Sequence, residues 1–257
     1  MCNFYFVLAI IGNLLYNKLG DFMKKLIMTD LDCTLLPMDQ DAYIELYVKE
    51  IAKLFYEHGY DGKAIAKATM KSSYMMGKND GSKTNEEAFE LAFSSIIKED
   101  TRKIIDTFPE VYGDRYHIIK TVTKENPYAE EIVKLMKEHA EYIVVATQPM
   151  FPLEAVKKRL SWIGIEHSQF DHITTYDNCT FCKPNPLYYK EIMDKFSATP
   201  ENTIMIGNDI TEDILPCEKL GVETFLVEDG LINTIDYDIS NLRKGSYVDL
   251  IEYLKTL

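Results

Sequence analysis

The sequence predicts an α/β fold in which an all-helical insert directly follows the first strand of a parallel sheet. Apolar runs of strand length alternate with amphipathic runs of helix length along most of the 257 residues. This alternation is typical of a parallel sheet that helices cover on both faces. The stretch from Asp41 to about Tyr116 contains helical patterns alone, and it therefore predicts the insert.

Composition limits the classes of partner. The chain is 46% hydrophobic and has 28 basic and 41 acidic residues, a net charge of −13. This acidic balance argues against binding of nucleic acid phosphates, but one local lysine with a metal can still bind a small phosphorylated substrate. Five scattered cysteines indicate reduced thiols in a cytoplasmic protein. The lone pair Cys179 and Cys182 has no second tight pair, so we expect ordinary thiols there and not a zinc site.

Residues 1–22 form an apolar N-terminal extension with three open interpretations. The run from Phe4 to Ile11 is well short of the roughly 20 residues of a membrane span. Neither preceding basic residues nor a cleavage site marks a signal peptide. The extension is a gene-model artefact with translation starting at Met23, an extra helix on the core, or a membrane anchor, and the length of the run disfavours the anchor.

The elements follow from periodicity and from helix start and stop signals. The first strand is an apolar run that ends at Asp30, and Thr84 with Glu87 forms a capping box for one helix of the insert. Later strands are expected at 142–146, 170–175, 203–207 and 222–227. Helices are expected at 41–58, 64–76, 88–98 and about 101–108 in the insert, and afterwards at 127–139, 152–162, 185–196, 213–220 and 248–254.

Asp30 and Asp32 stand at the carboxyl end of the first strand. In extended chain, residues two apart point to the same side, so the two carboxylates share a small volume. Their mutual repulsion suits a divalent metal between them, or a nucleophile beside an acid/base. The alternative is a strand-end turn with a capping aspartate. Two other Asp-x-Asp pairs, at 39–41 and 236–238, follow no strand-like run and are expected to be solvated.

Later strand ends add further polar residues. Ligands of parallel sheets bind beyond the carboxyl ends of the strands. Thr147 and Asp209 follow two predicted strands, and Lys183 lies just before a predicted helix. Asp213 is four residues after Asp209, on the same side if that turn is helical. We therefore expect these groups to converge on Asp30 and Asp32.

These residues resemble the four motifs of the haloacid dehalogenase superfamily, and the resemblance covers about Lys24 to Leu257. It implies a Rossmann-like core formed by residues 23–38 and 120–257, with a helical C1-type cap at 39–119. The chain looks closest to uncharacterised bacterial hydrolases of the phosphatase-like kind. The motifs here are Asp30-Leu-Asp32-Cys-Thr34, Thr147, Lys183 and Gly207-Asn-Asp209-Ile-Thr-Glu-Asp213.

The resemblance implies the chemistry of the two aspartates. Asp30 would attack phosphorus to form an aspartyl-phosphate. Asp32 would protonate the leaving group and then activate water. Mg²⁺ would be bound by Asp30, Asp209 and the backbone carbonyl of Asp32. Dehalogenases and phosphonatases of the superfamily lack an aspartate at the position of Asp32. Its presence here therefore disfavours both of these activities.

The resemblance also implies a phosphate-binding set made of Thr147, Gln148 and Lys183, with Asn208 and Asp213 in support. Gln148 stands where asparagine is common, so we expect altered specificity there. Cys33 stands where glycine is common, so the loop must turn without the freedom of glycine. Candidate cap residues facing the substrate are Tyr74, Lys78, Asn79 and Lys83.

The predicted function is a Mg²⁺-dependent phosphohydrolase for a small phosphorylated metabolite. Two alternatives remain open, a phosphomutase of the same superfamily and a non-catalytic binding protein on the same fold. A mutase would need a cap that excludes water from the intermediate.

Overall fold

A six-stranded parallel sheet lies at the centre of the computed structural model, which describes residues 23–257. The strand order is β3-β2-β1-β4-β5-β6, so the direction of winding reverses between β1 and β4. In the register, Thr29 of β1 lies beside Val145 of β2 and Ile206 of β4. The α/β Rossmann-like prediction is therefore confirmed. The strands are β1 (Lys24–Thr29), β2 (Ala140–Val145), β3 (His172–Ile173), β4 (Thr203–Gly207), β5 (Glu223–Val227) and β6 (Lys244–Gly245).

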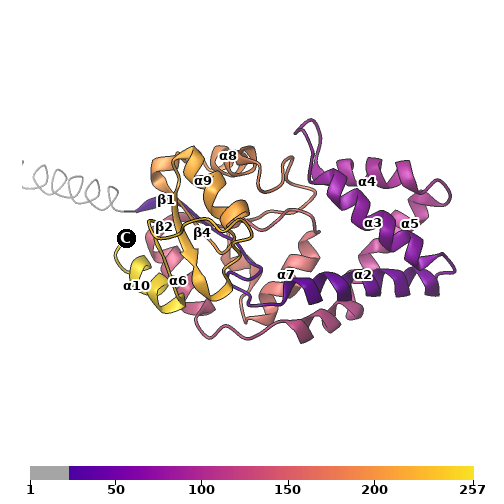
Figure 1. The fold of residues 1–257 in the computed structure, drawn as a ribbon, viewed down its shortest axis with the longest axis horizontal. Helices are drawn as coiled ribbons and strands as arrows, with labels where there is room; N and C mark the ends of the chain where they lie inside the picture. Colours follow the sequence, from indigo (N-terminus) through magenta and orange to yellow (C-terminus); the bar gives the residue numbers. More distant parts are fainter. Residues whose placement is uncertain (1–22) are drawn as a thin grey trace, which may run out of the picture.

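Helices cover both faces of this sheet (Figure 1). Side chains of β1 alternate between the two layers: Ile27 packs in the core cluster that holds α6, α7 and α10, whereas Leu26 and Met28 pack with α8 and α9. This alternation is the period of two that a strand imposes. The helices are α6 (Ala129–His139), α7 (Leu153–Trp162), α8 (Pro186–Lys195), α9 (Leu215–Leu220) and α10 (Tyr247–Leu254).

The cap is entirely helical and follows β1 directly, as predicted; Figure 1 shows it to the right of the sheet. Its centre is aromatic, since the rings of Phe55 and Phe93 meet Phe108 edge-on, with centroids 5.0 and 5.5 Å away. Such pairs add to the stabilisation from burial alone. The cap contains α2 (Gln40–Glu57), α3 (Gly62–Met76), α4 (Asn85–Ile96), α5 (Thr101–Thr107) and the 3₁₀ segments η1 (Phe108–Tyr112) and η2 (Asp114–Val122).

The start of α4 bonds the cap to the core. The backbone N–H of Asn85 donates to the carbonyl of Cys179 at 2.9 Å, and that of Glu86 donates to Tyr176 at 2.7 Å. The side chain of the fully buried Asn85 donates to the carbonyl of Phe181 at 3.1 Å. The first N–H groups of a helix lack partners inside it, so the core loop supplies them. The cap is thus held beside the loop that leads to Lys183.

Most predicted boundaries agree with the structure, and the exceptions have physical reasons. The capping box is confirmed, with the Glu87 N–H donating to Thr84 Oγ1 at 3.2 Å. The strand predicted at 170–175 is only two residues long, because it pairs with β2 alone at the edge of the sheet. β6 was not predicted, since two residues leave no apolar run. The remaining short turns are η3 (His167–Gln169), η4 (Pro200–Asn202), the π-helical η5 (Ile210–Ile214) and η6 (Glu228–Gly230).

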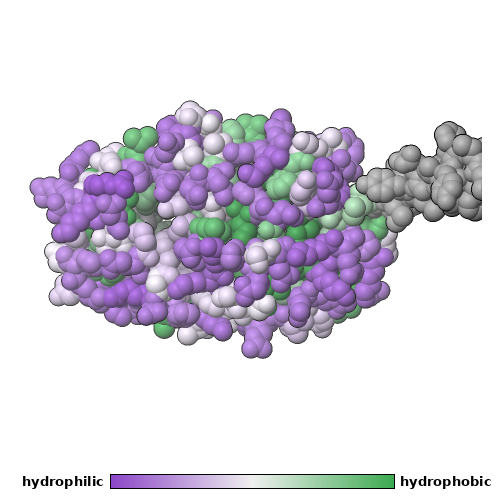
Figure 2. Space-filling view, turned by 180° about the vertical axis from the view of Figure 1, so that it is seen from behind, coloured by the Kyte–Doolittle hydropathy of each residue, from purple (hydrophilic) through white to green (hydrophobic). Residues whose placement is uncertain are grey.

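The surface is largely hydrophilic on the face seen in Figure 2, with some hydrophobic residues gathered near its middle between hydrophilic ones. Within residues 23–257, no helix is both long enough and apolar enough to cross a bilayer. The four cysteines of this part of the chain are buried free thiols, as expected. The interpretations of residues 1–22 lie outside the described residues.

Candidate active site

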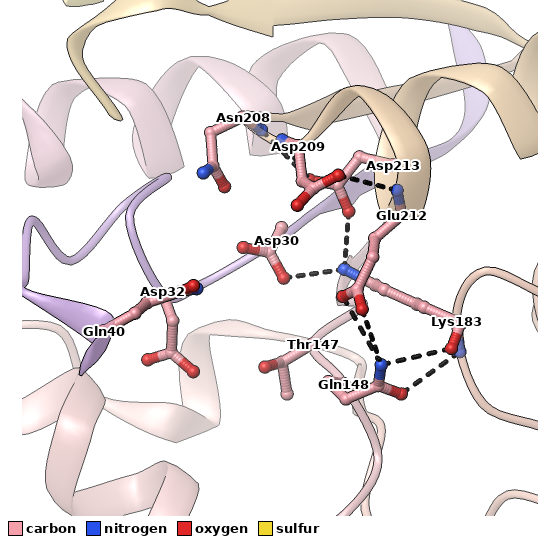
Figure 3. A pocket seen from close by; sticks show the side chains of 10 residues that line it. All are labelled: Asp30, Asp32, Gln40, Thr147, Gln148, Lys183, Asn208, Asp209, Glu212 and Asp213. Atoms are coloured by element: carbon pink, nitrogen blue, oxygen red, sulfur yellow. Dashed lines mark hydrogen bonds and ion pairs between the residues drawn. The ribbon is translucent and has the colours of Figure 1, made fainter. Parts of the chain in front are cut away.

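Polar side chains from three strand ends surround one small cavity at the point where the strand order reverses. Asp30 follows β1, Thr147 follows β2 after one residue, and Asp209 follows β4. The crevice at such a switch point is where ligands of these sheets bind. The cavity has a volume of about 110 Å³. Its lining, shown in Figure 3, consists of Asp30, Asp32, Gln40, Thr147, Gln148, Lys183, Asn208, Asp209, Glu212 and Asp213.

Lys183 is the buried cation of this cavity. Its Nζ lies 2.7 Å from Asp30 Oδ1 and 2.7 Å from Asp213 Oδ1. Burial opposes the charge of Lys183, but Asp213 and Asp30 hold its pKa well above the usual value. Burial raises the pKa of Asp30 to about 7 against the opposing attraction of Lys183, while Asp213 and Asp32 add to the rise. Lys183 therefore fixes Asp30 and offsets part of its charge.

Asp213 holds the loop after β4. Its Oδ2 accepts the backbone N–H groups of Asn208 and Asp209, both at 3.0 Å. A side chain at Gly207 would place its Cβ 2.4 Å from the Asp213 carboxylate, so only glycine permits this approach. The π-helical turn brings Asp213 back toward Asp209, and one carboxylate thereby orders both the loop and Lys183.

The loop after β1 takes the turn expected from Cys33. Its φ is +62°, in the left-handed region where glycine is favoured. The turn brings Thr34 Oγ1 to 3.2 Å from Asp30 Oδ2 and 2.8 Å from Asn208 Oδ1. The Asn208 side chain in turn donates to the carbonyl of Gly230 at 2.7 Å. Asp30 is consequently held from both ends of its carboxylate, by Thr34 and by Lys183.

Gln148 bonds to the segment that carries Lys183. Its Oε1 accepts the Lys183 N–H at 3.1 Å, and its Nε2 donates to the Lys183 carbonyl at 3.2 Å. The same Nε2 lies 3.3 Å from Glu212 Oε1. Burial raises the pKa of Glu212, although the Lys183 charge opposes the rise. The longer side chain of glutamine thus joins the loops after β2 and β4 through one amide.

Thr147 lies deep in the cavity with 1% of its surface exposed. Its carbonyl accepts hydrogen bonds from Thr174 Oγ1 and the Tyr188 hydroxyl, both at 2.8 Å. Its side chain is drawn beside those of Asp32 and Gln148 in Figure 3. The hydroxyl of Thr147 is therefore placed on a rigid strand end, facing the same space as Asp30.

Asp32 lies at the edge of this cavity and pairs with a residue that the sequence did not suggest. Its Oδ2 accepts a close hydrogen bond from Nη1 of Arg159, on α7. Figure 3 shows its carboxylate turned away from that of Asp30. The two neighbouring carboxylates thus have separate cations, Lys183 for Asp30 and Arg159 for Asp32.

The four cap candidates do not line the cavity. The Nζ of Lys78 lies over the ring of Tyr74, 4.2 Å from its centroid. The side chain of Asn79 donates to the carbonyl of Lys83 at 2.8 Å and to Asn85 Oδ1 at 3.0 Å. Asn79 therefore shapes its own turn and the docking of α4. The cap residue that does line the cavity is Gln40, the first residue of α2.

Three residues of the site were not predicted: Gln40, Arg159 and Glu212. Arg159 lies four residues after Ala155 and three after Val156, so it falls on the apolar face of its helix. A charged residue on an apolar helix face is the sequence feature that could have indicated Arg159. Glu212 lies within the Asp209–Asp213 motif. No sequence pattern indicates Gln40, because the position of its side chain depends on the path of the chain from the core into the cap.

The donor set of this cavity fits Mg²⁺. Asp209 Oδ1 accepts the N–H groups of Thr211 and Glu212 and the Thr211 hydroxyl, at 2.7–2.9 Å. These bonds fix the carboxylate, and Figure 3 shows its other oxygen on the side of Asp30. Within the described residues, no group of three His, Cys, Asp or Glu side chains forms a metal cluster. Mg²⁺ needs only one or two carboxylates, with water and substrate oxygens completing its shell.

Comparison with known proteins places this geometry in a family. The model of haloacid dehalogenase-like hydrolases matches residues 27–227. A glyceraldehyde 3-phosphate phosphatase of Methanothermobacter thermautotrophicus is 32% identical over 34% of this chain, and the chain spans 44% of that relative. The same-named enzyme of Methanocaldococcus jannaschii is 26% identical, with 91% of this chain and 99% of the relative covered.

A solved 2-haloacid dehalogenase from Pseudomonas syringae superposes with a TM-score of 0.60 at 13% identity, covering 91% of this chain and 99% of its own. At that identity it shows the fold alone. The family match covers well over half of the chain and includes the strand ends that carry Asp30, Thr147 and Asp209. The protein is therefore an enzyme of the haloacid dehalogenase-like hydrolase family, as its four motifs indicated.

Proposed function

We propose that this enzyme is a Mg²⁺-dependent phosphohydrolase that removes the phosphoryl group of a small metabolite through an aspartyl-phosphate at Asp30. The observation that carries the proposal is the position of Asp30. Its carboxylate lies in a small polar cavity with Thr34 3.2 Å from one oxygen and Lys183 2.7 Å from the other. A nucleophile held in this way loses little freedom when it attacks.

The chemistry follows from the groups around the cavity. An oxygen of Asp30 bonds to phosphorus as the bond from phosphorus to the leaving oxygen breaks, and Asp32 gives that oxygen its proton. Water then attacks the phosphorus of the aspartyl-phosphate, gives a proton to Asp32, and releases inorganic phosphate with Asp30 restored. Thr147 and Lys183 hold the phosphoryl oxygens throughout.

Asp30, Asp209 and the backbone carbonyl of Asp32 would hold Mg²⁺. When bound, the metal neutralises the carboxylates and the phosphoryl oxygens, so that one anion can approach another. Asp213 would act indirectly, because its bonds order the backbone of Asp209 and orient Lys183.

The size of the cavity supports a small substrate. The cavity has a volume of about 110 Å³ and is lined by polar side chains alone. A phosphoryl group fits this space, and the rest of the substrate must extend toward the mouth, where Gln40 of the cap lies. The names of the two curated relatives, both glyceraldehyde 3-phosphate phosphatases, agree with a substrate of this size.

Release of inorganic phosphate from p-nitrophenyl phosphate tests the proposal. We expect activity with Mg²⁺, loss of activity with a chelator, and loss in Asp30→Asn. Asp238→Asn is the matched control, because Asp238 belongs to another Asp-x-Asp pair and is exposed. An Asp30→Asn protein as active as the parent would exclude the proposal. Isomerisation of a sugar phosphate without release of phosphate would instead favour the mutase.

A further inference from the structure

Arg159 is a charged residue in a fully buried position. It is 0% exposed and lies on the apolar face of α7, where a hydrocarbon side chain would be expected. Its Nη1 pairs with Asp32 Oδ2, and its Nε lies 3.4 Å from the carbonyl of Ala155. Although burial opposes the charge, Asp32 keeps the pKa of Arg159 above its ordinary value. Arg159 is therefore a guanidinium cation directly behind the proposed acid/base.

Aromatic rings fix the guanidinium in place. It lies 4.9 Å from the centroid of Phe151 and 6.0 Å from that of Tyr43, within the range of cation–π attraction. The Tyr43 hydroxyl lies 2.9 Å from that of Tyr116. Tyr43 belongs to α2 and Tyr116 to η2, so both chain connections of the cap contribute to this setting. The rings of Phe151 and Tyr43 contact each other edge-on, with centroids 6.0 Å apart, so the flat cation packs against both and has little freedom to turn.

The ion pair has one contact where two are possible. Arg159 Nη2 and Asp32 Oδ1 are both buried, and neither has a hydrogen-bond partner among the described residues. Arginine and carboxylate can form two parallel bonds, but this pair forms one, so Arg159 holds Oδ2 of Asp32 and leaves Oδ1 without a partner within residues 23–257. One oxygen of Asp32 is thus fixed by Arg159, and the other is available for proton transfer.

Stability alone gives a weak reason for this arrangement. Desolvating a guanidinium and a carboxylate costs several kcal/mol, and well-packed hydrocarbon side chains are often equally stable in place of a buried pair. A directed role accounts for the charge better, because Asp32 must reach the leaving oxygen on one side of the cavity.

We propose that Arg159 is a positioning residue that sets the direction of the Asp32 carboxylate for proton transfer to the leaving group. The inference rests on the proposed function. Arg159 touches Asp32 and not the substrate, and it acts by fixing one oxygen of the carboxylate while the other is available for proton transfer. Its loss should therefore slow the reactions that need a proton and spare those that do not.

The leaving group provides the test. p-Nitrophenyl phosphate releases a stable phenolate that needs no proton, whereas benzyl phosphate releases an alkoxide that does. In Arg159→Met we expect kcat/KM for benzyl phosphate to fall roughly 100-fold, in the range of a lost general acid, and that for p-nitrophenyl phosphate to fall less than about 3-fold. Arg115→Met is the control, because Arg115 pairs with two other carboxylates, Glu50 and Glu57 of the cap. It should leave the ratio of the two kcat/KM values unchanged.

A double-mutant cycle with Asp32→Asn separates positioning from folding. If Arg159 acts through Asp32, adding Arg159→Met to Asp32→Asn changes the ratio no further. An equal fall with both substrates in Arg159→Met, or a further change of the ratio in the Asp32→Asn background, would overturn the inference. If Arg159→Met does not fold, Arg159→Lys is measured in its place and the same outcomes decide. Hydrolysis of p-nitrophenyl phosphate by the parent tests the proposed function separately.

Discussion

Replacing Lys183 by methionine is the perturbation with the largest predicted effect on stability. The side chains of Lys183 and Asp213 are each 1% exposed, and that of Asp30 is 10% exposed. The substitution keeps the length of the side chain and removes a charge bonded to two buried carboxylates. Removing one partner of a buried ion pair costs about 3–5 kcal/mol, and we expect a loss of this size in the free energy of unfolding.

The short contacts of Lys183 with Asp30 and Asp213 account for the size of the expected loss in the free energy of unfolding. At an effective dielectric constant of about 20, each 2.7 Å contact contributes roughly 6 kcal/mol of gross attraction. Part of the attraction that Lys183→Met loses is offset when one of the two carboxylates binds a proton and becomes neutral. The pKa of Asp30 is already raised to about 7, by burial and against the attraction of Lys183, and it rises further without that attraction. Protonation of Asp30 at neutral pH therefore limits the cost.

Urea denaturation at pH 7, with and without Mg²⁺, measures the effect. Lys24→Met is the matched control, because Lys24 pairs with Glu223 at 2.8 Å while their side chains are 20% and 31% exposed. Such a surface pair contributes at most about 1 kcal/mol. Mg²⁺ should restore part of the stability of Lys183→Met, since it returns positive charge beside Asp30. Equal losses in the two variants, with hydrolysis retained in Lys183→Met, would refute the reasoning.

Three further predictions concern the metal, the pH dependence and the first loop. Asp209→Asn should raise the Mg²⁺ concentration for half-maximal activity at least roughly tenfold, because one of two facing carboxylates is lost; an unchanged titration would remove Asp209 from the metal site. His172→Gln should flatten the pH dependence of thermal stability between pH 6.5 and about 4. Burial, and to a lesser degree the charge of Lys195, lowers the pKa of His172 to about 4. The unfolded chain therefore binds this proton at a higher pH than the folded protein does, and stability falls as the pH falls. The parent should lose on the order of 1 kcal/mol through this window, allowing for partial exposure, and equal slopes would contradict this. Cys33→Gly should be roughly 1–2 kcal/mol more stable than Cys33→Ala in thermal denaturation, because both variants lose the thiol and only glycine escapes the penalty of a Cβ at φ +62°; equal stabilities would exclude backbone strain.

The convergence of strand-end residues on one cavity was predictable because a parallel sheet aligns the carboxyl ends of its strands. Asp30, Thr147 and Asp209 needed only the strand boundaries to be brought together. Lys183 was placed by its position ahead of a helix that begins with Asn185-Pro186. The sequence pattern was sufficient for these residues, since their directions depend on the backbone of regular elements.

The remaining residues depend on packing between elements distant in the sequence. Arg159 reaches Asp32 only because α7 lies under the loop after β1 and the rings of Phe151 and Tyr43 hold its guanidinium. Gln40 reaches the cavity because of the angle at which α2 leaves the core. The turn at 78–83 was correctly predicted as a turn, but no local pattern indicates that it docks α4 on the core and stays outside the cavity.

Trapping of the covalent intermediate tests the central claim most directly. Enzyme mixed with Mg²⁺ and a phosphorylated substrate is quenched in acid, treated with borohydride, and digested for mass spectrometry. Borohydride reduces an aspartyl-phosphate to homoserine, so the peptide that contains Asp30 should carry that mass change only when substrate was present. Reduction at another aspartate, or none at Asp30 while the phosphoenzyme accumulates, would contradict the assignment of Asp30 as the nucleophile.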